Sequence, residues 1–246
     1  LAPHLALRPA FITEVMEQQL INMGNILCKV IDVSAQFVQD NEMVCSIVAK
    51  SPRAEASGVT IKPSHRRYAP IIRTDYLWVP TATEPHPVIV DINLVPGATQ
   101  ICHGITNVFE ELFANDLKEL GNIRGYRANE ICQVIREEYE VWQKIHSSTT
   151  NPPRFAFVIR EGHGLVPEMI HWTKMFQDQT GLTAAIVYVD QIKSVKNGII
   201  YTDLGEFNAM VRMVRPITKH VEPNRVAIEN KVVQEIMAAY YNGELF

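Results

Sequence analysis

The sequence lacks several features that would place a protein in a well-defined class. Its four cysteines, Cys28, Cys45, Cys102 and Cys132, stand far apart and form no Cys-x-x-Cys pair, which argues against a zinc site and fits reduced thiols. No apolar run approaches the roughly 20 residues that a membrane helix needs, and the amino terminus lacks the basic-then-apolar order of a signal peptide. We therefore expect a cytoplasmic protein without a membrane partner.

Strong charge of one sign is also missing. The formal net charge is -4 over 246 residues, and no run of lysine and arginine exceeds two residues. This distribution provides no electrostatic surface for a nucleic acid, so we expect no nucleic-acid partner. The sequence contains no Gly-x-Gly-x-x-Gly fingerprint, no nucleophile elbow and no evident Ser-His-Asp or Cys-His set, so a dehydrogenase or a hydrolase has no support.

The residues that are present are ordinary for a globular protein, with 47% apolar and 20% charged side chains. The polar and proline-rich segment 147–153 resembles a linker, so we predict two domains, 1–150 and 151–246. The predicted class is α/β, with an α+β half that contains a hairpin, followed by a Rossmann-like parallel layer. Apolar periodicity predicts helices over 10–38, 101–120, 128–146, 167–179 and 226–241, and strands over 155–159, 184–189, 199–201 and 207–214; residues 42–50 fit a strand or a helix.

We predict that the functional site of the protein lies within residues 73–97. Two short apolar runs, 76–79 and 88–90, flank a loop rich in proline and threonine, which indicates a hairpin. Asp91 and Asn93 are two residues apart at the end of the second run, as Arg73 and Asp75 are at the start of the first. Strand alternation would direct each pair to one face and Ile92 into a core.

This set of side chains suits a divalent cation together with phosphate. Carboxylate and amide oxygens are the ligands that Mg²⁺ prefers, and a guanidinium matches phosphate oxygens. The alternative is a solvated hairpin in which the aspartates and Asn93 close turns and Arg73 pairs with Asp75 at the surface.

The motif Arg-x-Asp, a loop, then Asp-x-Asn and a Pro-Gly turn resembles the circularly permuted ATP-grasp group that includes glutathionylspermidine synthetase and eukaryotic glutathione synthetase. The resemblance implies that Asp75, Asp91 and Asn93 bind the Mg²⁺ of ATP and that Arg73, as a catalytic residue, contacts the transferred phosphate. The family usually has glutamate at the position of Asp91, whose side chain is one methylene shorter.

A second group of candidate residues belongs to the C-terminal half. Arg160 and His163 follow the first strand of that half, and glycines flank His163, so this loop could bind an anionic substrate or be a plain flexible loop. The resemblance adds an arginine at the end of a later strand, which matches Arg215 or Arg212. We predict Arg160, His163 and Arg215 as substrate ligands.

The resemblance implies an ATP-dependent ligase that joins a small-molecule carboxylate to an amine through an acyl-phosphate. The alternative is a non-catalytic binding domain derived from such a ligase. ATP-grasp enzymes hold the nucleotide with a lysine-bearing lobe and a Gly-rich flap, and no such lobe follows Phe246. We expect the chain either to be part of a longer protein or, if it is complete, to bind nucleotide weakly or not at all. The sequence leaves the oligomeric state open, a homo-oligomer included.

Overall fold

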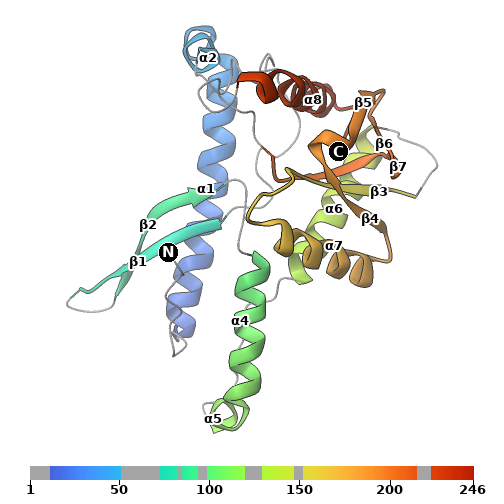
Figure 1. Cartoon of the computed structure of the whole chain (residues 1–246). Coiled ribbons are helices and arrows are strands. Elements are labelled where there is room, and N and C mark those ends of the chain that lie inside the picture. The colour runs from blue at the N-terminus through green and yellow to red at the C-terminus, as the bar shows by residue number, and fades with distance from the viewer. Residues whose placement is uncertain are drawn as a thin grey trace.

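The computed structural model describes residues 12–50, 73–81, 85–93, 99–119, 129–146, 152–214 and 223–246 (Figure 1). It confirms the α/β class, because helices combine with strands that include a parallel sheet. The first half is formed by α1 (Glu14–Asp40), α2 (Glu42–Ala49), β1 (Arg73–Val79), β2 (His86–Asn93), α4 (Thr99–Leu112) and α5 (Ala114–Glu119).

Asn41 explains why the ambiguous residues 42–50 form a helix. Its backbone N–H donates to the carbonyl of Phe37 at 3.1 Å and ends α1, while its side-chain oxygen accepts from the N–H of Val44 at 3.0 Å and begins α2. At the other end of α1, the hydroxyl of Thr13 accepts from the N–H of Met16 at 3.2 Å. The helix runs without interruption through Gly24.

The second half is a three-layer α/β/α unit. Its central parallel sheet has the strand order β4 (Thr183–Tyr188), β3 (Arg154–Ile159), β8 (Ala209–Arg212), which confirms the predicted parallel layer. A separate antiparallel sheet has the order β5-β6-β7. The elements are α6 (Asn129–His146), β3 (Arg154–Ile159), α7 (Val166–Thr180), β4 (Thr183–Tyr188), the 3₁₀ helix η1 (Val189–Gln191), β5 (Ile192–Lys196), β6 (Ile199–Thr202), β7 (Gly205–Phe207), β8 (Ala209–Arg212) and α8 (Pro223–Tyr241).

Alternation along β3 creates two cores, one on each face of the parallel sheet. Phe155, Phe157 and Ile159 are completely buried against α6 and α7. Ala156 and Val158 are completely buried on the other face, against α8 and the antiparallel sheet. A strand buried on both faces needs a continuous apolar run, which is why the sequence predicted β3 well.

The predicted strand over 207–214 is two strands in different sheets, and Asn208 separates them. Its side-chain oxygen accepts from the N–H of Arg154 at 2.8 Å, and its own N–H donates to the carbonyl of Arg154 at 3.2 Å. These two bonds hold Asn208 to the start of β3, so β7 ends in one sheet and β8 begins in the other. The predicted helix over 101–120 is likewise divided, at Phe113, into α4 and α5.

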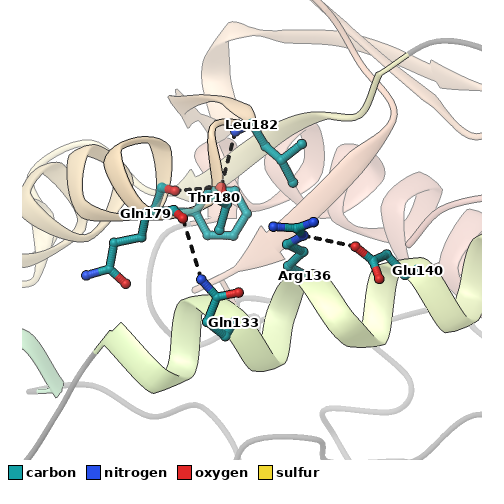
Figure 2. Close-up of polar contacts among 7 residues, drawn as sticks. Gln133, Arg136, Glu140, Gln179, Thr180 and Leu182 are labelled. Atoms are coloured by element: carbon teal, nitrogen blue, oxygen red, sulfur yellow. Dashed lines mark hydrogen bonds and ion pairs between the residues drawn. The ribbon is translucent and has the colours of Figure 1, made fainter.

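Helix α6 precedes the proposed domain boundary at residue 150, but its apolar side chains belong to the core of the second half. Cys132, Ile135, Tyr139 and Trp142 pack in one cluster with β3 and α7. Figure 2 shows a polar contact along the same interface, where the side-chain amide of Gln133 donates to the carbonyl of Gln179 at 3.5 Å. The boundary itself stays a prediction, and this core extends across it.

Within the described ranges, no helix is both long enough and apolar enough to cross a membrane.

Candidate functional site

The hairpin of β1 and β2 brings the four predicted metal and phosphate residues together in its backbone register. Arg73 is the cross-strand partner of Asn93, and Asp75 is the partner of Asp91. The intervening pair is Thr74 with Ile92. For Arg73 and Asn93, the structure describes the backbone pairing and not the side chains.

A β-bulge lies directly beside these pairs. The register shifts between Asp75 and Tyr76, so that Tyr76 faces Ile89 and Val90 is left as the extra residue. Because the shift comes after Asp75, strand alternation remains regular from Arg73 to Asp75 and from Asp91 to Asn93. No pattern in the sequence predicted this bulge, which separates the polar end of the hairpin from its apolar end.

The two aspartates differ in exposure. Asp75 is half-buried, whereas Asp91 is exposed and its Oδ1 accepts from the N–H of Ile92 at 2.8 Å. The expectation that Ile92 points into a core is wrong, because 41% of this residue is exposed. The more buried face of the hairpin instead carries Tyr76, Trp78 and Pro87, and β2 runs alongside α1 (Figure 1).

The chemistry of the Asp75–Asp91 pair fits a divalent cation. Side chains that are directly opposite on antiparallel strands have Cβ atoms about 4.5–5.5 Å apart, and like charges at this separation destabilise the sheet. Carboxylate oxygens are ligands that a divalent cation such as Mg²⁺ accepts. Among the described residues, no cluster of three His, Cys, Asp or Glu side chains could hold a metal. A metal held by this pair would need Asn93, phosphate oxygens or water as further ligands.

The predicted substrate loop lies at the carboxyl end of β3. The carbonyl of Arg160 accepts from the N–H of His163 at 3.2 Å, and Gly162 supplies the positive φ of 72° in this turn. The exposed ring of His163 accepts from the N–H of Leu165 at 3.2 Å through Nδ1. In a neutral His163 this leaves the proton on Nε2, directed away from that bond.

The third predicted substrate ligand, Arg215, lies outside the described residues. The alternative, Arg212, ends β8, and its Nη1 donates to the carbonyl of Val214 at 2.8 Å. Because Arg212 is the register partner of Val158 on the parallel strand β3, Arg160 and Arg212 lie at the same edge of the sheet.

This edge is the topological switch point of the parallel sheet. From β3 the chain passes through α7 to β4 on one side, while β8 lies on the other side of β3, and α7 and α8 cover opposite faces. Ligands of open α/β sheets bind in the crevice where the strand order reverses. Glu168, in the first turn of α7, is buried near this edge and was not singled out in the sequence.

Arg154 was also missed. It begins β3 at the opposite edge of the sheet and lines a cavity. The only signal in the sequence is its place between Pro153 and the apolar run of β3.

Comparison with known proteins adds no family, since the chain matches no protein-family model and no curated protein sequence.

Proposed function

We propose that this chain carries the metal- and phosphate-binding hairpin of a cytoplasmic, ATP-dependent carboxylate–amine ligase of the ATP-grasp type. The observation that supports the proposal is the register of β1 and β2, in which Asp75 faces Asp91 and Arg73 faces Asn93. The resemblance of the motif to the permuted ATP-grasp group supplies the reaction class.

In this proposal each side chain of the hairpin has one role. Asp75, Asp91 and Asn93 hold Mg²⁺, and Arg73 binds the phosphoryl group that passes from ATP to the substrate carboxylate. The bound ion would neutralise the charge of the ATP phosphates. Positioning and charge stabilisation supply most of the catalysis in phosphoryl transfer, so the proposal requires no general base.

The second half of the chain would hold the substrates. Arg160, His163 and Arg215 are proposed to bind the acidic substrate at the carboxyl edge of the parallel sheet. An amine then displaces phosphate from the acyl-phosphate to form the amide.

One observation favours the second candidate function, a non-catalytic binding domain. Asp91 is exposed and has a shorter side chain than the glutamate that is usual in the family. A ligand that reaches less far weakens metal binding, so the ligase architecture could remain after catalysis was lost.

Mg-ATP binding separates the two candidates. The ligase proposal predicts that saturating Mg-ATP raises the melting temperature of the full-length protein by about 3 °C or more, because a ligand that binds the native state stabilises it. The measurement is differential scanning fluorimetry on wild type, Asp91→Ala and Asn93→Ala, both of which should lose the shift. Asp178→Asn, at an exposed position of α7, is the matched control and should retain it. An unchanged melting temperature in the wild type would rule out the ligase.

A further inference from the structure

A cavity of about 360 Å³ opens at the amino edge of the parallel sheet. Arg154 and Thr183, which begin β3 and β4 and are register partners, form one side of it. The other side comes from the antiparallel sheet, through Ile199, Glu206 and Phe207. This edge is opposite to the one that carries Arg160, so the cavity is distinct from the proposed substrate site.

The guanidinium of Arg154 has two close neighbours on β7, Phe207 and Gly205. Its Cζ lies 5.1 Å from the centroid of the Phe207 ring, within the range of a cation–π contact. The backbone of Gly205 also lies close to the guanidinium, since a Cβ added there would come within 3.1 Å of Nη1. Gly205 has a φ of 110°, which other residues rarely adopt, so the close approach depends on glycine at this position.

The backbone of Arg154 is fixed as well, through its two hydrogen bonds with Asn208. Across the parts of the chain that the structure describes, no carboxylate forms an ion pair with its guanidinium. Arg154 is half-buried and lines the cavity, and a guanidinium in such a position suits bidentate binding of a carboxylate.

We propose that this cavity binds a small zwitterion, an amino acid or a short peptide, with its carboxylate on Arg154 and its ammonium group on Glu206. Glu206 is exposed and lines the same cavity, where it supplies the negative charge that an ammonium group needs. The same carboxylate would repel a phosphate, so a simple anion fits less well. A volume of this size is within the range of small-molecule sites, and Ile199 and Phe207 offer apolar contact to a side chain.

The zwitterion L-alanyl-L-alanine is a suitable probe. Titrated into the full-length protein and followed by ¹H–¹⁵N correlation spectra, it should shift the amide signals of residues 154, 183 and 206 in a saturable manner. N-acetyl-L-alanyl-L-alanine lacks the ammonium group, and L-alanyl-L-alanine amide lacks the carboxylate. The affinity of each should therefore be lower than that of the free dipeptide by about tenfold or more.

Substitutions give the second arm of the test. Arg154→Gln should weaken binding of the probe about tenfold, and Glu206→Gln should abolish the preference for the free ammonium group over the acetylated form. Lys174→Gln, at an exposed position of α7, is the charge-matched control and should change neither. If Arg154→Gln does not fold, Glu206→Gln and the two capped peptides still decide the matter. Non-saturable shifts, or equal affinity for free and capped peptides, would overturn the proposal, which does not depend on Mg-ATP binding at the hairpin.

Discussion

At the scale of single residues, burial determines the chemistry of Cys132. Its side chain projects from α6 and is completely buried in the core cluster with β3 and α7, and burial raises the pKa of the thiol to about 11, while the neighbouring Trp172 lowers it by a smaller amount. The thiol therefore stays protonated in the folded protein at neutral pH. Cys28, by contrast, is exposed on α1.

The raised pKa of Cys132 predicts how stability changes with pH. Below about pH 9 the thiol is protonated in both the folded and the unfolded chain, so it adds no pH dependence. Between about pH 9 and 11 only the unfolded chain ionises, so the free energy of unfolding should fall by about 2–3 kcal/mol. Urea unfolding at a series of pH values measures this slope.

Cys132→Ala should remove most of that slope, and Cys28→Ala should leave it unchanged. Tyr139 adds a contribution of the same sign, because burial raises its pKa too, and Tyr139→Phe isolates that part. A slope that is identical in wild type and Cys132→Ala would show that the thiol is accessible to water.

At the scale of elements, the turn between β5 and β6 is fixed by the carboxyl-terminal residues. Asn197 and Gly198 have φ values of 50° and 73°, as the Asn-Gly sequence predicts for a tight hairpin. A Cβ added to Gly198 would overlap the backbone carbonyl of Glu244. Glycine is therefore required here both for its conformation and for the space that it leaves.

Gly198→Ala should destabilise the protein through both effects. Left-handed backbone costs about 1–2 kcal/mol for alanine, and overlap with a fixed backbone adds about 1–3 kcal/mol. Gly181→Ala is the matched control, since Gly181 has a φ of 68° but open space around its Cα, and should lose only the first amount. Chemical denaturation of both variants measures the difference, and equal losses would mean that residue 244 does not cover the turn.

Local signals in the sequence explain which elements could be predicted. The apolar run of β3 is such a signal, and the strand predicted from it is confirmed; the Asn-Gly turn and the glycine that ends α7 are signals of the same short range. The separation of β7 from β8 depends on hydrogen bonds between Asn208 and Arg154, 54 positions apart, which no local pattern can reveal.

The candidate sites also differ in whether local spacing or long-range contacts bring their residues together. The i, i+2 spacing of Arg73 with Asp75 and of Asp91 with Asn93 was sufficient to expect a shared end of one hairpin, and the register agrees. The cavity at Arg154 is assembled from β3, β4, β6 and β7, so its residues come together only in the fold.

At the scale of the whole molecule, α6 joins the two halves of the sequence. Trp142 is buried, and its ring centroid lies 5.7 Å from that of Tyr139 and 6.1 Å from that of Phe246. The core of the parallel sheet therefore includes residues from before the predicted boundary.

Trp142→Ala should destabilise the parallel sheet by about 3–5 kcal/mol, the usual cost of removing a large buried aromatic side chain. Val141→Ala on the same helix is the control, because Val141 is exposed and its truncation should cost less than about 1 kcal/mol. Hydrogen exchange of the β3 amides measures the loss of stability in the parallel sheet itself. Unchanged β3 protection in Trp142→Ala would mean that the sheet folds independently of α6.

The central claim is that the polar end of the hairpin binds a divalent metal together with ATP. Paramagnetic Mn²⁺, added with ATP to ¹⁵N-labelled protein, tests it directly. The amide signals of Thr74, Asp75, Asp91 and Ile92 should broaden first, and Asp75→Asn with Asp91→Asn should abolish the effect. Broadening that is confined to other elements, or that persists in the double variant, would contradict the account.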